Sequence, residues 1–168
     1  MIQSDYERLI EPIEDRMIGS IWRIVRDPDD ADDAFQEALA KIWKSLPKIL
    51  RHPNPQALIL RICLNAAYDL IRKRTRLRQR EEEDSIVEDF PDNSASAFER
   101  LLGQERERQI MKAIGFLPRR QAQAVLMRFV EDLSYGDIAQ ALGCAETTVR
   151  SHIAKARKQL ALTIENLS

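Results

Sequence analysis

Apolar residues recur at spacings of three and four along most of the chain, and this spacing predicts a fold made of helices. Glycine and proline are scarce inside these stretches, and alternation of β-branched residues is absent from the sequence. The clearest stripe belongs to a helix expected over 31–46 and comprises Phe35, Ala38, Leu39, Ile42, Trp43 and Leu46. We therefore expect an all-α protein with a proline-rich loop at 47–55 and helices at 4–25, 31–46, 55–78, 98–117, 119–130, 134–142 and 145–163.

Charge divides the chain into two halves. The net charge of -1 conceals a basic run from Arg72 to Arg80 and a second basic stretch from Arg150 to Lys158. Residues 81–98, between them, contain no lysine or arginine. We expect two small helical domains, 1–80 and 98–168, joined by an acidic linker at 81–97. Basic patches separated in this way indicate binding to a polyanion.

The strongest local motif lies near the C-terminal end. Ser134 can cap a short helix, and Gly143 can supply the positive φ of a sharp turn into a second helix, which would bury Val149, Ile153, Ala156 and Leu160. Helix, glycine turn and helix in this order are typical of a helix-turn-helix unit. At about 100° per residue the second helix exposes a face suited to the major groove: Thr147, Ser151, Ala154, Lys155 and Lys158, flanked by Arg150 and Arg157. We favour DNA binding over the alternative, an ordinary helix pair with a basic solvent face.

A polar stripe survives on the otherwise apolar helix expected at 55–78. Three- and four-residue steps relate its members, which are Arg61, Asn65, Tyr68, Asp69 and Arg72. Taken alone, the stripe is better interpreted as an ordinary solvated face. The basic run that follows it is either a solvated helix end, favoured by the helix dipole, or a set of phosphate contacts. The second DNA-binding motif downstream favours phosphate contacts.

The sequence gives little support for an enzyme. It contains no Ser/His/Asp set, glycine-rich phosphate loop or metal-binding cluster, so we expect no catalytic residue, metal or cofactor. Cys63 lies in an apolar helix and is expected in the core, whereas Cys144 lies in the turn and could be exposed. No apolar run reaches the length of a membrane span and no signal peptide opens the chain, so we expect a cytoplasmic protein without membrane insertion.

Three segments resemble bacterial sigma factors. The first, Asp29 to Leu46, reads D-D-A-D-D-A-F-Q-E-A-L-A-K-I-W-K-S-L and resembles region 2. The second, Leu58 to Arg74, looks like its continuation. The third, Leu117 to Leu160, carries the core T-V-R-S and is similar to region 4. Two such regions with a short linker resemble the small extracytoplasmic-function (ECF) group.

The resemblance implies a protein that recruits core RNA polymerase to promoters and helps to open the DNA. Its polymerase contacts would be the β′ clamp helices and the β flap, with the clamp helices docked by Asp33, Gln36 and Glu37. An anti-sigma factor is a further implied partner. The helical periodicity agrees with this docking role in part, because it places Asp33 and Glu37 opposite the apolar stripe of the same helix. Simple solvent exposure would place acidic residues there too.

The resemblance also implies two DNA contacts. The single-stranded minus-10 element would be bound by the loop at 49–56 and by Arg61, Asn65 and Asp69, with phosphates held by Arg72, Lys73 and Arg74. The minus-35 duplex would be read through Thr147, Thr148, Arg150, Ser151, Ala154, Lys155 and Lys158. The chain departs from the family at Leu58 and Leu60, where aromatic rings are usual, and at His152, which replaces an arginine and should affect packing or phosphate contact.

A second function stays open at this point. The chain could be a free-standing helix-turn-helix regulator whose N-terminal half is a dimerisation or sensor bundle. Such a regulator would bind a palindromic site unaided, usually as a dimer. We favour the sigma factor because the N-terminal half ends in a basic helix and shows no apolar dimer seam.

Overall fold

The predicted all-α fold is confirmed. The computed structural model describes residues 2–82 and 95–167, with side chains described for 3–77 and 105–163, and it holds no strand within these ranges. The elements in chain order are α1 (Ile2–Ile10), the 3-10 turn η1 (Glu11–Ile13), α2 (Glu14–Val25), α3 (Pro28–Lys44), α4 (Leu46–Arg51), α5 (Pro55–Glu82), α6 (Ala95–Ile114), α7 (Arg119–Phe129), α8 (Tyr135–Leu142) and α9 (Glu146–Leu167).

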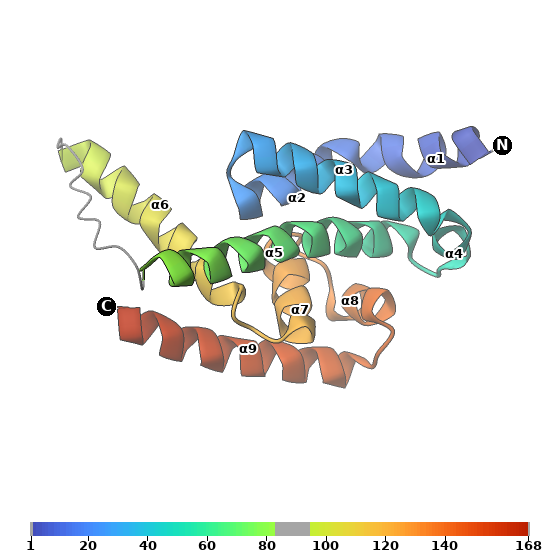
Figure 1. Cartoon of the computed structure of the whole chain (residues 1–168). Coiled ribbons are helices and arrows are strands. Elements are labelled where there is room, and N and C mark those ends of the chain that lie inside the picture. Colours follow the sequence, from blue (N-terminus) through green and yellow to red (C-terminus); the bar gives the residue numbers. More distant parts are fainter. Residues whose placement is uncertain (1, 83–94, 168) are drawn as a thin grey trace.

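Helix α5 runs through the middle of the molecule, with α1 to α3 on one side and α7 to α9 on the other (Figure 1). Its N-terminal half is buried almost all round, because Ile59, Leu60 and Cys63 have no exposed surface. An apolar helix of this kind needs cover on two sides, which explains why both halves of the chain pack against it. One hydrophobic cluster consequently extends without interruption from Ile10 to Ala156.

Two expectations about the first 55 residues are wrong. The helix expected at 4–25 is interrupted by η1, since Pro12 has no N–H to continue the α-helical ladder. The loop expected at 47–55 contains α4, in which Pro47 occupies the first turn, where a proline is tolerated. Helix α4 forms because Leu46 and Ile49 are three residues apart and both reach the core. Pro47 therefore begins a helix here instead of ending one.

Helix α3 begins with a side-chain cap and a proline. The side chain of Asp27 accepts a hydrogen bond of 3.0 Å from the backbone N–H of Asp30 and caps the helix. The helix begins at Pro28, three residues earlier than expected, because proline is favourable at the first helical position.

The two halves lie against each other. The hydroxyl of Tyr68 on α5 donates a 2.8 Å hydrogen bond to the carbonyl of Leu117, just before α7. Arg16 on α2 forms a 2.6 Å ion pair with Glu131, which follows α7 and whose side chain is 4% exposed. Helix α5 also continues to Glu82, and α6 already begins at Ala95. The remainder of the linker expected at 81–97, residues 83–94, lies outside the described part of the chain.

The two cysteines should differ sharply in reactivity. Cys63 has no exposed surface, and burial, together with the charge of Glu131, raises the pKa of its thiol to about 12. Cys144 is half-buried and free. Because the thiolate is the reactive form, Cys144 should react with a disulfide reagent in the native protein and Cys63 only after unfolding. A native Cys144→Ser chain that still reacted as fast as the wild type would contradict this.

Candidate nucleic-acid interface

Helices α8 and α9 form the predicted helix-turn-helix. The hydroxyl of Ser134 accepts a 3.0 Å hydrogen bond from the N–H of Asp137 and caps α8. Gly143 ends that helix with φ of +67°, which glycine adopts without a steric cost. The turn then lets α9 lay its inner residues Val149, Ile153 and Ala156 into the core.

The outer face of α9 is exposed, as the helical periodicity of the sequence predicted. All seven residues assigned to minus-35 recognition lie on this surface: Thr147, Thr148, Arg150, Ser151, Ala154, Lys155 and Lys158. The guanidinium of Arg150 lies 5.1 Å from the ring centroid of Tyr135. Arg157 lies at the same distance from the ring of Phe129. Such stacking restricts the two arginines while their N–H groups stay available to a ligand.

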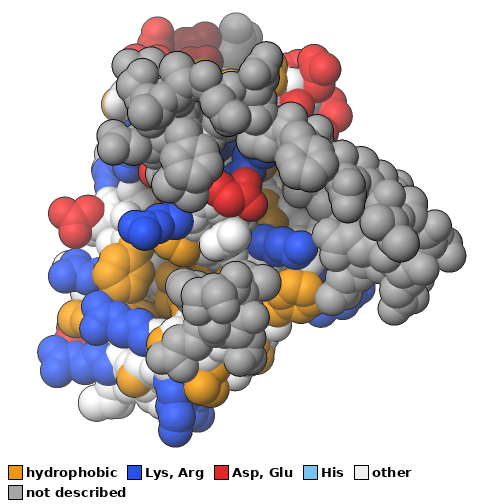
Figure 2. Space-filling model, turned by 90° about the vertical axis from the view of Figure 1, so that its left-hand side faces the viewer, with side chains coloured by type: hydrophobic (Ala, Val, Ile, Leu, Met, Phe, Trp, Pro, Cys, Tyr) orange, Lys and Arg blue, Asp and Glu red, His pale blue; other side chains and the backbone are white. Residues whose placement is uncertain are grey.

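These cations are not neutralised within the protein. Among the described side chains, no carboxylate forms an ion pair with Arg150, Lys155, Arg157 or Lys158. Figure 2 views the end of the molecule at which α5 and α9 terminate, and Lys and Arg side chains predominate over its lower part while Asp and Glu gather toward its top. The α9 face therefore presents unpaired positive charge of the kind that attracts a polyanion.

His152 lies at the side of this face and is half-buried, close to the predicted position near the core. Burial lowers its pKa, and the charges of Lys155 and Arg120 lower it further. The lowered pKa favours the neutral ring, whereas an arginine here would carry a positive charge.

Three polar side chains of α5 are half-buried and bond to the other half of the chain. A guanidinium N–H of Arg61 donates to the carbonyl of Ala141 at 3.0 Å, and the amide of Gln123 donates to the side-chain oxygen of Asn65 at 2.8 Å. Arg119 forms an ion pair of 2.8 Å with Asp69. The interpretation of this stripe as a solvated face is therefore wrong for Arg61 and Asn65, which bond to α8 and α7, whereas the side chain of Asp69 stays 35% exposed beside Arg119. We call these three residues the α5 polar face.

The basic end of α5 is divided between solvent and protein. Lys73 is exposed and Arg72 is half-buried. Arg74 instead forms an ion pair with Asp30 and lies 4.0 Å from a carboxylate oxygen of Asp27. In this arrangement Arg74 is held by the first turn of α3, so that Lys73 is the most accessible of the three predicted phosphate contacts.

The residues expected to dock on polymerase are exposed. Asp33, Gln36 and Glu37 lie on the outer face of α3, while Ala34, Ala38 and Ile42 are buried. Glu37 forms a 2.9 Å ion pair with Lys41 one turn later. Asp33 and Gln36 therefore offer the more readily available polar contacts of this set.

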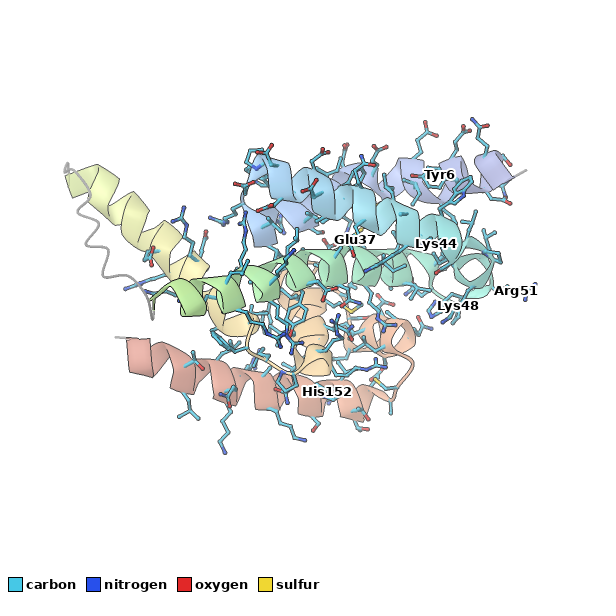
Figure 3. The ribbon with its side chains drawn as sticks, in the orientation of Figure 1. Tyr6, Glu37, Lys44, Lys48, Arg51 and His152 are labelled. Atoms are coloured by element: carbon cyan, nitrogen blue, oxygen red, sulfur yellow. The ribbon has the colours of Figure 1, made fainter. Side chains whose placement is uncertain are left out.

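One cationic surface was missed by the sequence analysis. Lys44, Lys48 and Arg51 are exposed near the end of α3 and on α4, where Figure 3 labels them. None of the three has an acidic partner within the described part of the chain. Their spacing of four and three was the available signal, but the assignment of 47–55 as a loop concealed it. We call these three residues the α4 basic strip.

The segment between α4 and α5 contacts α8. The N–H of Asn54 donates to Nδ1 of His52 at 3.0 Å, so the other ring nitrogen carries the proton and donates to the carbonyl of Gln140, also at 3.0 Å. The amide of Asn54 donates to a carboxylate oxygen of Asp137 at 3.0 Å. The end of the loop expected to bind DNA is thus docked on the helix-turn-helix.

Within residues 2–82 and 95–167, no three His, Cys, Asp or Glu side chains gather as metal ligands. No helix in these ranges is long and apolar enough to cross a membrane.

Comparison with known proteins decides between the two DNA-binding functions. The family description "Sigma-70 region 2" matches residues 9–77, and "Sigma-70, region 4" matches residues 107–160. The chain belongs to the ECF group of the sigma-70 family. This sigma factor directs RNA polymerase to promoters, and the alternative of a free-standing regulator is not favoured.

Relatives agree with this membership. The sigma factor is 27% identical over 170 residues to an ECF RNA polymerase sigma-E factor of Haemophilus influenzae, covering 96% of this chain and 88% of that protein. It is 29% identical over 170 residues to an RNA polymerase sigma-H factor of Pseudomonas aeruginosa, covering 96% and 87%.

Two solved structures share its fold. The sigma factor RpoE of Bartonella quintana, in complex with the anti-sigma factor NepR, matches with a TM-score of 0.56 and 24% identity over 96% of this chain and 97% of that one. CnrH in complex with the cytosolic domain of CnrY gives a TM-score of 0.58 and 19% identity over 99% and 91%.

Two glycine substitutions should shift stability in opposite directions. Gly143→Ala places a Cβ in the left-handed region and should lower the free energy of unfolding by roughly 1–2 kcal/mol. Gly19→Ala lies inside α2 with no atom within 4 Å of the new Cβ, so it should raise that free energy by up to about 1 kcal/mol. Urea denaturation measures both, and a Gly143→Ala chain as stable as Gly19→Ala would contradict the assigned turn.

Proposed function

We propose that this sigma factor reads the minus-35 duplex with the outer face of α9. The observation that carries the proposal is the exposure of seven assigned residues on one face, where the cations have no carboxylate partner among the described residues. Arg150 and Lys155 would donate to base edges or phosphates, and the hydroxyls of Thr148 and Ser151 would donate to either. Ala154 leaves room for a base edge to approach the helix.

The single-stranded minus-10 element would bind along α5 and α4. The α5 polar face would supply donors and acceptors to the bases, while Arg72 and Lys73 would hold phosphates. Helix α4 contacts α5, so the α4 basic strip would extend the positive charge of this route. Leu58 and Leu60 are buried, so the loss of the family's usual aromatic rings at these positions changes the core and not an exposed stacking surface.

Polymerase would dock on the outer face of α3 through Asp33, Gln36 and Glu37, and region 4 would contact the β flap. The protein would carry out no chemistry of its own, because nucleotide transfer belongs to polymerase, and it would act in the cytoplasm without a metal or cofactor. An anti-sigma factor would hold it inactive; both solved structures of similar fold carry a bound protein, which one of them names as an anti-sigma factor.

Run-off transcription on a genomic library with purified core polymerase tests these contacts. Arg150→Ala should weaken use of promoters that depend on the minus-35 element by about 1–3 kcal/mol if Arg150 makes a bidentate base contact. Asn65→Ala should reduce opening at the minus-10 element. Arg8→Ala is the matched control, because Arg8 is an exposed cation on α1, away from both surfaces. Unchanged promoter choice in both test variants would argue against the assigned contacts.

A further inference from the structure

We propose that this sigma factor binds a nucleotide with two or more phosphates in a cleft between α2 and α6. The cleft has a volume of about 280 Å³ and is lined by Trp22 and Arg23 of α2, by Arg26 at the end of that helix, and by Arg108 of α6. We call these four residues the α2–α6 cleft. None of them belongs to the residues assigned to DNA or to polymerase.

The α2–α6 cleft combines an aromatic ring with guanidinium groups. Trp22 is 46% exposed, and its indole forms no ring-stacking or cation–π contact among the described side chains. An exposed indole offers a flat apolar face on which a planar base can stack. Guanidinium groups bind phosphate oxygens through paired N–H donors. A ligand that carries both a planar base and phosphates matches this combination.

Most of the positive charge in the cleft is available to a ligand. Within the described part of the chain, neither Arg23 nor Arg108 forms an ion pair with a carboxylate. Arg23 donates one N–H to the carbonyl of Val130 at 2.9 Å, which holds its guanidinium and leaves other N–H groups free to bind. Arg26 forms an ion pair with Glu107. Two uncompensated cations around one ring favour an anionic ligand over a neutral one.

The backbone at Arg26 supports a functional role for the cleft. Helix α2 ends there with φ of +52°, and the N–H of Arg26 donates to the carbonyl of Trp22 at 2.9 Å. Glycine adopts this left-handed conformation without a steric cost, whereas an arginine does not. Backbone strain of this kind concentrates at ligand sites. The chain therefore places an arginine where the backbone alone would favour glycine, and this arginine lines the cleft.

A second cavity gives the ligand more room. Its volume is about 390 Å³, and its lining includes Arg26 and Arg108, which it shares with the cleft. It also includes apolar groups such as Ile71 and Met111, together with the half-buried Lys112. Ligand sites commonly measure about 300–1,000 Å³. The cleft and the adjoining cavity together are thus large enough for a nucleotide.

The two sides of the cleft come from the two family regions. Trp22 lies within the segment that matches region 2, and Arg108 lies within the segment that matches region 4. A nucleotide held by both binds the folded chain and not the unfolded one, so it should raise the Tm. The cleft contains neither Asn65 nor Arg150, so the inference and the proposed DNA contacts can fail independently.

The scarcity of tryptophan allows the site to be observed directly. Trp43→Phe leaves Trp22 as the only tryptophan of the chain and keeps a ring against Tyr6, whose centroid lies 5.6 Å from that of Trp43. ADP titrated into this full-length chain should quench the emission of Trp22 and raise the Tm. Adenosine lacks the phosphates and pyrophosphate lacks the base, so each should bind about tenfold more weakly than ADP, or weaker still.

Two arginines on α6 provide a matched pair of variants. In the Trp43→Phe chain, Arg108→Gln removes a cation of the cleft and should weaken ADP binding about tenfold. Arg106→Gln is the control, because Arg106 is an exposed arginine on the same helix that lines neither cavity. Circular dichroism establishes that each variant retains its helices.

Three results would overturn the inference. If ADP neither quenches Trp22 nor raises the Tm, the cleft binds no nucleotide. If pyrophosphate binds as tightly as ADP, the cleft is an anion site on which no base stacks. If Arg106→Gln weakens binding as much as Arg108→Gln, the attraction is a general effect of charge. None of these results bears on the contacts of α9 and α5, which run-off transcription tests.

Discussion

The burial of α5 from two sides is the constraint on which the rest of the structure depends. Its N-terminal half is apolar on most faces, and Ile59, Leu60 and Leu64 are almost wholly removed from water. One layer of helices cannot cover such a helix, so α2 and α3 take one side and α7 and α8 take the other (Figure 1). The same packing brings the two family regions, separate in sequence, into one body.

The spacing of apolar residues predicted most helices, because a helix depends on side chains only three and four residues apart. The turn at Gly143, the cap at Ser134 and the two faces of α9 all depend on neighbours within a few residues, and all were predicted. Helix α4 was missed because Pro47 is compatible with either a helix start or a helix end. The α4 basic strip was missed for the same reason.

Long-range partners could not be predicted in this way. Arg16 and Glu131 are 115 positions apart, and nothing near either residue in the sequence indicates the other. The same limit applies to the α5 polar face, which local spacing correctly grouped but could not assign to solvent, to DNA or to another helix. In the structure, residues on α7 and α8 bond to the α5 polar face. In the proposed function, single-stranded DNA binds the same side chains.

The cations on the outer face of α9 have no carboxylate partner among the described residues, whereas the members of the α5 polar face are bonded within the chain. We expect the α9 face to engage promoter DNA only when polymerase positions it. The most direct test places a photo-crosslinking amino acid at Lys158 and irradiates the full chain with promoter DNA, with and without core polymerase. Crosslinks upstream of the start site that require polymerase would agree with the account. Equal crosslinking without polymerase would contradict it, because the chain would then bind DNA as a free-standing regulator.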